Sequence, residues 1–295
     1  MRRLFAIACL VFLCGAVVQK KDGTYVSDIT VAGLWKIYKP YDYKDYLYVR
    51  DWHYPPVFLQ KMPSDYDKIS DIDERNRLFL MILAPLAMKV NKDILKEREE
   101  FLKLRDAFKE KGALDTKQSK RLDEIAQKYD SFTHLKDDPR LEYLFTELEK
   151  KINELPPSVL IGVAILETDW GTSKALKKGN SLYKELVWHT DEGLRPEGET
   201  EDNSYRIRIF PSLYDSMYSY ALKLNSGINY EQTRFLRSEL KRRGRVVLGT
   251  ELIHSMVFDS NLPNFAGLLD YTVNFYQLDI FDESKLAAPK NVTKN

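Results

Sequence analysis

Apolar and polar positions follow a helical period along much of the chain. Ile94, Phe101 and Phe108 recur at intervals of seven residues, with leucines beside them. This spacing places the apolar side chains on one face of a helix and leaves the charged ones on the other. The pattern stops at residues 112–115 and returns over residues 117–129. It therefore predicts a helical hairpin whose outer face is solvated.

Later in the chain the helical period returns in four segments, and one short stretch has the period of a strand. Helices are predicted at residues 212–225, 231–243, 250–257 and 265–276. Tyr205, Ile207 and Ile209 instead alternate with two arginines, as in a half-buried strand. The sequence therefore predicts a small β-hairpin within a mainly helical fold.

Residues 18–68 are rich in tyrosine, tryptophan and proline and have little periodicity. Two interpretations stay open. The rings could form a surface that stacks on sugars. Alternatively, the segment could be an extended arm whose rings are buried and whose tyrosine hydroxyls are exposed to solvent. The next apolar run, residues 78–88, contains Pro85 and is too short to cross a bilayer. We interpret it as a buried core helix.

The first residues have the organisation of a secretory signal. Arg2 and Arg3 precede an uncharged apolar run over residues 4–18, and small residues follow Cys14. We expect residues 1–17 to be a signal peptide of a protein exported to the periplasm or cell envelope, with no other membrane association. An uncleaved anchor and a lipidated Cys14 are the alternatives. Both cysteines lie in this segment, so the mature chain would have no thiol chemistry.

Composition narrows the classes of function. The chain has 295 residues, 44% of them hydrophobic, and 45 basic against 44 acidic residues give a net charge of +1. These values suit a globular protein and give no electrostatic argument for nucleic-acid binding. The four histidines are scattered, and no phosphate-binding glycine loop is present. We therefore expect no metal, no cofactor and no nucleic-acid partner.

The most informative stretch is ILETDWGTS, residues 165–173. Two prolines just upstream favour a helix start, and Leu160, Val163 and Glu167 then share one helix face. Gly171 offers the left-handed turn that ends the helix. Burial and the negative end of the helix dipole would both favour a protonated Glu167, which a general acid in glycoside hydrolysis requires. A partly exposed glutamate beside the core is the alternative.

The sequence ETDWGTSKALKKGNSLY, residues 167–183, resembles the signature of the glucosaminidase family, in which E-x-x-W-G precedes a glycine–asparagine loop. The segments DEGLRPEG, YRIRIFPSLYDSMYSYALKLNS, NYEQTRFLRSEL and NFYQLDIFDESKL follow in the order and spacing of the family's Bax-like branch. The likeness covers residues 135–286 well and extends more loosely upstream. These proteins are usually described as endo-beta-N-acetylglucosaminidase-like and belong with the bacterial peptidoglycan hydrolases.

The resemblance implies a mainly α fold of the α+β class. A lysozyme-like glucosaminidase domain with a small β-hairpin would follow an N-terminal arm and a helical hairpin. It also implies an exported glycoside hydrolase that cleaves β-1,4 bonds after N-acetylglucosamine in peptidoglycan or a related glycan. The predicted division is residues 1–17 signal peptide, 18–68 arm, 69–134 helical hairpin, 135–286 glucosaminidase-like domain and 287–295 C-terminal tail.

The resemblance further implies roles for single residues in the motif. Glu167 would be the general acid. Trp170 would lie beneath it or in the cleft, with a core position as an equal alternative. Asn180 resembles the residue that braces the loop after the catalytic helix through its amide. We place Asn180 and Tyr183 among the substrate-binding residues.

A second carboxylate is needed by most glycosidases, and in related glucosaminidases it sits on the hairpin. Glu199 is our first candidate, and Glu201, which we also assign to substrate binding, is the second. An ordinary acidic loop explains the same cluster. Assistance by the acetamido group of the sugar would remove the need for this acid.

The chain departs from the family pattern at several positions. Threonine and aspartate replace the usual small residues directly after the glutamate, and Lys184 stands where glycine is usual. Phe258 and Phe265 align with two family tyrosines, one of which is thought to line the reacting centre. Tyr271, which we assign to substrate binding, or Tyr276 could supply the missing hydroxyl. A catalytically weakened or inactive glycan-binding or envelope scaffold protein is therefore the alternative function.

Basic residues gather in residues 234–245. They have two interpretations. They could contact an anionic wall polymer, or they could form a solvated helix face with a cationic end that complements the helix dipole.

Overall fold

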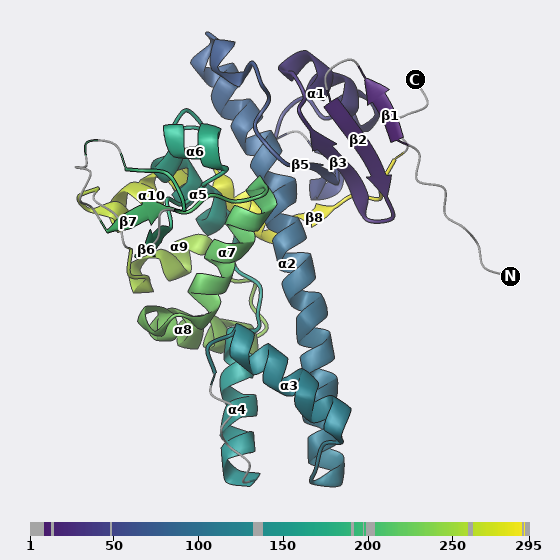
Figure 1. The fold of residues 1–295 in the computed structure, drawn as a ribbon, viewed down its shortest axis with the longest axis vertical. Coiled ribbons are helices and arrows are strands. Elements are labelled where there is room, and N and C mark those ends of the chain that lie inside the picture. The colour runs from purple at the N-terminus through teal and green to yellow at the C-terminus, as the bar shows by residue number, and fades with distance from the viewer. Residues whose placement is uncertain are drawn as a thin grey trace, which may run out of the picture. The chain divides into compact units, whose positions relative to one another are not determined.

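The computed structural model describes residues 9–12, 15–47, 49–131, 138–189, 192–196, 198, 204–258, 262–290 and 292. The chain forms two compact units. Unit 1 comprises residues 1–89, 160–220 and 283–295, and unit 2 comprises residues 90–159 and 221–282. Helices predominate and the strands are short (Figure 1). The predicted mainly α fold of the α+β class is confirmed.

The N-terminal segment of unit 1 folds into a small sheet beside helix α1 (Val31–Tyr38) (Figure 1). Its strands run in the order β1 (Cys9–Phe12), β2 (Gly15–Lys20), β3 (Gly23–Ser27) and β5 (Val57–Leu59). The first two pairings are antiparallel and the third is parallel. The segment for which an extended arm was one of two interpretations therefore contains short strands and helix α1.

A second pairing joins this segment to the C-terminal residues of unit 1. Strand β4 (His53–Tyr54) pairs in parallel with β8 (Lys285–Leu286). The backbone N–H of Ala287 donates to the carbonyl of Tyr54 at 2.8 Å. The backbone N–H of Lys290 donates to the hydroxyl of Tyr41 at 2.8 Å. The described residues of the predicted C-terminal tail are thus bonded to the N-terminal part of the chain at Ala287 and Lys290.

Helix α2 (Ile72–Lys111) contains Pro85 in its interior, where a proline has no N–H to donate to the carbonyl four residues earlier. That carbonyl belongs to Met81. It accepts hydrogen bonds from the hydroxyls of Tyr38 at 3.3 Å and Tyr43 at 3.4 Å. Both tyrosines are buried. Two rings from the aromatic segment therefore satisfy the backbone group that the proline leaves open, and this lets an apolar helix continue through Pro85.

We expect the double variant Tyr38→Phe, Tyr43→Phe to lose about 1–3 kcal/mol of unfolding free energy, because it leaves the buried Met81 carbonyl without a donor. Each single variant should lose less than half of this, since the other hydroxyl still donates. Urea unfolding of the two single variants and the double variant measures the coupling between the two sites. Strictly additive losses would contradict the shared role.

The predicted helical hairpin forms at the end of α2. The chain turns after Lys111, and Asp115 caps the start of α3 (Thr116–Lys128) by forming a capping box with Gln118. Ion pairs join the two helices: Arg121 contacts Glu100 at 2.9 Å and Lys128 contacts Glu97 at 2.8 Å. The charged outer face of the hairpin is therefore partly used for pairing between its helices.

The other elements of unit 2 are helical. They are α4 (Asp138–Lys151), α8 (Glu231–Arg242), α9 (Gly249–Leu252) and α10 (Phe265–Phe275), with the 3-10 turns Ile228–Tyr230, Ile253–Ser255 and Leu278–Glu283. Leu240, Val247 and Leu252 form a buried cluster there. All four helices predicted between residues 212 and 276 are present, with α7 (Leu213–Ser226) as the first.

The predicted β-hairpin is also present, in unit 1. Strand β6 (Leu186–Trp188) pairs antiparallel with β7 (Tyr205–Ile207). The strand ends at Ile207 and does not reach Ile209, because the backbone N–H of Phe210 donates to the carbonyl of Gly179 at 2.8 Å. Gly179 ends α6 (Lys174–Gly179), so this bond ties the hairpin to the loop that follows the motif helix.

Within the described residues, no helix combines the length and the apolar character that a membrane span requires.

Candidate functional site

The motif glutamate lies in α5 (Pro157–Thr168), and this helix is more deeply buried than one apolar stripe requires. Residues 157–165 are all buried. A helix that is apolar on all sides is typical of the interior of a protein. Its proline stands at the first helical position, as the sequence predicted. Glu167 is therefore held one residue from the end of a rigid, buried element.

An acidic side chain caps the start of α5. The carboxylate of Asp282 accepts hydrogen bonds from the backbone N–H of Ser158 at 2.8 Å and from its hydroxyl at 2.7 Å. It also accepts from the backbone N–H of Gly249 at 2.8 Å, at the start of α9. One carboxylate thus satisfies open donors at two helix starts. Burial raises the pKa of Asp282 to about 7, although these hydrogen bonds oppose the shift.

This raised pKa predicts a pH dependence of stability. Between about pH 4 and pH 7 the folded protein binds a proton at Asp282 that the unfolded chain has released, so unfolding free energy falls as pH rises. We expect wild type to lose up to about 4 kcal/mol more than Asp282→Asn across this window. Denaturant titrations of both proteins at several pH values measure the difference.

Asparagine cannot ionise, so the variant lacks this contribution at every pH. It also loses the bond to Gly249, because its amide nitrogen cannot accept, but that loss does not vary with pH. Parallel pH profiles for wild type and Asp282→Asn would contradict the assignment.

A left-handed turn follows Glu167. Asp169, Trp170 and Gly171 all have positive φ, at 48°, 54° and 83°, and only glycine adopts this region without cost. The hydroxyl of Thr168 donates to the carbonyl of Ala164 at 2.6 Å and accepts from the N–H of Gly171 at 3.0 Å. The predicted turn is therefore present, and the threonine that departs from the family pattern is bonded into it.

Two aromatic residues from earlier in the chain also pack against this turn. The hydroxyl of Tyr66 donates to the carbonyl of Trp170 at 2.9 Å, and the ring of Phe79 meets the ring of Trp170 edge-on at 6.2 Å. A Cβ at Gly171 would lie 2.9 Å from the ring of Phe79. The half-buried Trp170 thus packs on Phe79, while its contact with substrate stays a prediction, and nothing in the motif alone pointed to Tyr66 or Phe79.

Glu167 keeps a narrow exposed edge. Its side chain is 11% exposed, and its Oε2 lies 3.6 Å from the Nζ of Lys184, whose side chain is 43% exposed. Within the described part of the chain, this is the ion pair that Glu167 forms. Lys184 has a φ of 47°, in the region where glycine is favoured. The sequence pattern marked Lys184 as unusual but did not indicate that it contacts Glu167.

Asn180 braces the loop after α6. It has a left-handed conformation at the end of that helix, and its amide nitrogen donates to the carbonyl of Phe210 at 3.0 Å and to that of Pro211 at 3.4 Å. The residue is buried. This geometry fits the bracing role, while a contact of Asn180 with substrate stays a prediction.

Tyr183 lies in the core of unit 1. Its hydroxyl donates to the carbonyl of Leu160 at 3.0 Å, and its ring stacks on that of Tyr220 at 4.1 Å. Burial raises the pKa of Tyr183 well above its ordinary value. Because the hydroxyl is already bonded to the backbone of α5, we do not propose Tyr183 as a substrate contact.

Tyr271 belongs to α10 in unit 2 and is exposed, with its ring stacked on Phe275 at 5.5 Å. Phe258 and Phe265, which align with family tyrosines, contact each other at 4.8 Å. A role of Tyr271 in binding substrate stays a prediction.

The two candidates for the second carboxylate, Glu199 and Glu201, lie outside the described residues. A cavity in unit 2, with a volume of about 450 Å³, is lined by residues of α2 and α4 and by Gly112, and by none of the candidate site residues. Within the described ranges, no group of three histidine, cysteine, aspartate or glutamate side chains is arranged to hold a metal ion.

Two basic residues of α8 correct part of the sequence interpretation. Arg234 and Arg237 are buried, so they form neither a solvated face nor a contact for wall polymer. Nη1 of Arg237 donates to Oδ1 of Asn225 at 2.7 Å and to the carbonyl of Glu154 at 3.2 Å, and Nη2 donates to the carbonyl of Lys150 at 2.6 Å. Burial lowers the pKa of Arg237 to about 9.

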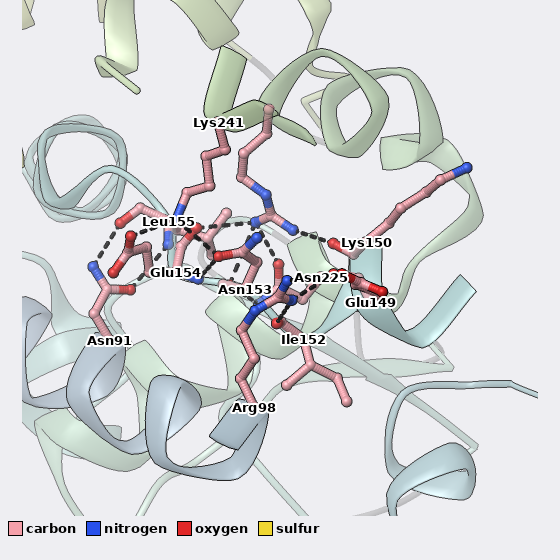
Figure 2. Close-up of polar contacts among 11 residues, drawn as sticks. Asn91, Arg98, Glu149, Lys150, Ile152, Asn153, Glu154, Leu155, Asn225 and Lys241 are labelled. Carbon is pink, nitrogen blue, oxygen red and sulfur yellow. Dashed lines mark hydrogen bonds and ion pairs between the residues drawn. The ribbon is translucent and has the colours of Figure 1, made fainter. Parts of the chain in front are cut away.

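These carbonyls belong to residues 150–155, which connect α4 to α5 and which we call the connecting turn. Figure 2 shows the polar side chains that converge on it. Arg98 donates to the carbonyls of Glu149 and Ile152 at 2.5 and 2.7 Å, and Asn91 exchanges two hydrogen bonds with the backbone of Leu155. The unpaired carbonyls at the end of α4 are thus satisfied by side chains, which holds the chain directly before the glutamate helix.

Comparison with known families covers the same part of the chain. Residues 144–249, which include the connecting turn, α5 and the hairpin, match the glucosaminidase family, described as mannosyl-glycoprotein endo-beta-N-acetylglucosaminidase. The chain is also 24% identical over 199 residues to protein bax of Escherichia coli (strain K12), a match that covers 67% of this chain and 65% of that protein. The chain is therefore similar to the Bax-like glucosaminidases over this part of its length. The resemblance found in the sequence is therefore confirmed.

The chain is also similar to the exo-glucosaminidase LytG of Bacillus subtilis (strain 168), with 24% identity over 135 residues. That match covers 43% of the chain and 46% of LytG. Among solved structures, the catalytic domain of the autolysin Auto from Listeria monocytogenes matches with 17% identity and a TM-score of 0.30, covering 60% of this chain and 94% of that domain. The chain spans less than two thirds of the length of both relatives.

Proposed function

We propose that the protein is a glycoside hydrolase in which Glu167 is the general acid. The observation that carries this proposal is the position of the glutamate. It ends a buried apolar helix inside the segment that matches the glucosaminidase family, and its side chain keeps an 11% exposed edge. A carboxyl group in such a place is reachable by a polymer yet largely removed from water, as proton donation to a leaving oxygen requires.

The proposed substrate is peptidoglycan or another glycan that contains N-acetylglucosamine, cleaved at the β-1,4 bond after that sugar. Glu167 would protonate the departing glycosidic oxygen, and water would attack through an oxocarbenium-like transition state. Glu199 is the first candidate for the second carboxylate, and Glu201 the second. The acetamido group of the sugar is the alternative source of assistance.

We further propose that the protein acts in the cell envelope. Two observations support this location: the basic and apolar first residues have the composition of an export signal, and one relative is named as an exo-glucosaminidase. The proposed substrate lies outside the inner membrane, so export and activity are consistent with each other.

The experiment that tests the proposal is digestion of purified peptidoglycan, followed by borohydride reduction and mass spectrometry of the fragments. Reduced N-acetylglucosamine at the new ends is the expected product. Reduced N-acetylmuramic acid would contradict the bond assignment. An NMR assay of the first anomer released would decide between retention and inversion, which the separation of the two carboxyl groups otherwise indicates.

A second candidate function is glycan binding without hydrolysis. The observation that favours it is the ion pair between Lys184 and Glu167, because a carboxylate engaged with a cation does not donate a proton. A protein that sediments with peptidoglycan at every pH but releases no fragments would support this function over the first.

A further inference from the structure

The ion pair at Glu167 is built from a fixed carboxylate and a fixed lysine backbone. On one side of Lys184, the hydroxyl of Tyr183 donates to the carbonyl of Leu160, and the N–H of Leu182 donates to the hydroxyl of Ser216 at 2.9 Å. On the other side, the N–H of Arg208 donates to the carbonyl of Glu185 at 2.7 Å. The lysine side chain therefore starts from an anchored point beside α5.

The backbone conformation at this point does not favour a lysine. Lys184 has a φ of 47°, and residues with a Cβ pay a conformational cost there that glycine avoids. The family resemblance also places a glycine at this position. A residue held in an unfavourable conformation at a candidate site is a reason to look for a role of its side chain.

The exposed fractions of the two side chains show which of them a ligand meets first. Lys184 is 43% exposed and Glu167 is 11% exposed, so the ammonium covers part of the edge through which the carboxylate meets solvent. The separation of 3.6 Å is that of an ion pair without a close hydrogen bond. A ligand can therefore displace the ammonium without breaking a buried polar network.

The neighbouring charges do not replace Lys184. The carboxylate of Asp169, on the turn after α5, accepts from the hydroxyl of Thr172 at 3.1 Å. The carboxylate of Glu185, beside Lys184, accepts from the hydroxyl of Ser219 at 2.9 Å. Both are negative, and in the described residues Lys184 is the cation that Glu167 contacts.

We propose that Lys184 is a positioning residue that pairs with the carboxylate of Glu167 in the ligand-free protein, and that a bound glycan must displace its ammonium before Glu167 can donate a proton. This inference rests on the proposed function of Glu167 as the general acid. An opposite charge at this distance stabilises the ionised carboxylate. Lys184 would therefore restrict hydrolysis at neutral and higher pH.

The test compares the pH profiles of kcat/KM for fragment release from purified peptidoglycan in wild type, Lys184→Met, Lys184→Gly and Lys184→Arg. This profile reports the protonation of groups in the free enzyme. In the methionine and glycine variants, the fall of kcat/KM on the alkaline side should shift to higher pH by about one pH unit. The arginine variant should restore the wild-type profile. Only glycine should also raise the thermal unfolding midpoint, because it alone relieves the left-handed backbone.

Lys177→Met is the matched control. Lys177 is also in unit 1, its side chain is 40% exposed, and it pairs with Asp67 at 2.9 Å. Its loss should leave the profile unchanged. An alkaline limb that stays in place in Lys184→Met, or that moves equally in Lys177→Met, would overturn the proposal.

A readout without turnover separates this inference from the proposed function. Carboxyl ¹³C NMR of the free protein follows ionisation of Glu167, with Glu167→Gln used to assign the signal. A change in its titration midpoint in Lys184→Met supports the positioning role even if wild type hydrolyses no glycan, and in that case the proposed function alone fails. An unchanged midpoint overturns the positioning role whatever the activity.

Discussion

Replacing Glu167 with glutamine should lower fragment release from purified peptidoglycan by about 100- to 10,000-fold, the range that a general acid contributes. Glutamine has nearly the same shape but carries no acidic proton. It also removes the charge that pairs with Lys184, so the fold and the binding of glycan should be kept. Initial rates of reducing-end release, together with cosedimentation of the variant with peptidoglycan, measure the two effects separately.

Asp169→Asn is the control for this prediction. Asp169 is a carboxylate two residues further along, exposed to solvent, and its side chain bonds to Thr172. Its loss should change the rate by no more than a few fold, because it does not lie at the end of the buried helix. If Glu167→Gln kept most of the activity, or if Asp169→Asn lost as much, Glu167 would not be the acid.

The Arg237→Ala variant should lose about 3–5 kcal/mol of unfolding free energy. Arg237 is 1% exposed, and its guanidinium donates to backbone carbonyls of the connecting turn and to Asn225. Truncation leaves these buried acceptors without donors and opens a cavity, and each effect is costly. Urea or guanidinium unfolding of the whole chain gives the difference.

Arg242→Ala is the matched control, because it removes an arginine from the same helix. The side chain of Arg242 is 70% exposed and pairs with Glu239 at 2.8 Å, so we expect a loss within about 0.5 kcal/mol. Arg237→Lys should fall between the two, since an ammonium cannot reproduce the planar fork of donors. Equal losses for Arg237→Ala and Arg242→Ala would show that the buried network does not hold the connecting turn.

Local patterns predicted the helices well because their signals are contained in a few neighbouring residues. The break after Lys111 and the cap at Asp115 are visible in the sequence, as are the prolines before α5 and the glycine after it. The motif residues were likewise found because the family signature keeps them close together in sequence. The position of Glu167 at the end of a buried helix follows from the same signals.

Contacts between distant residues could not be predicted in this way. Arg234, Arg237 and Lys241 follow one another at helical spacing, and this fits a charged face as well as a buried one until the carbonyls of the connecting turn are placed. The hydroxyls of Tyr38 and Tyr43 bond to the carbonyl of Met81 in α2. That carbonyl is open because Pro85 stands four residues later in the same helix, and neither tyrosine belongs to that helix. Lys184 was marked as unusual, but its contact with Glu167 needed the fold of the loop between them.

The parallel pairing of β4 with β8 has a consequence for how the chain is made. Tyr41 and Lys290 are separated by 249 positions, yet they are hydrogen-bonded. Unit 1 cannot complete this edge until Lys290 has been synthesised and has left the ribosome, so strand β4 waits for a partner that is made much later. Contacts of such long sequence separation form slowly, and the growing chain therefore passes through a period in which chaperones can act on this edge.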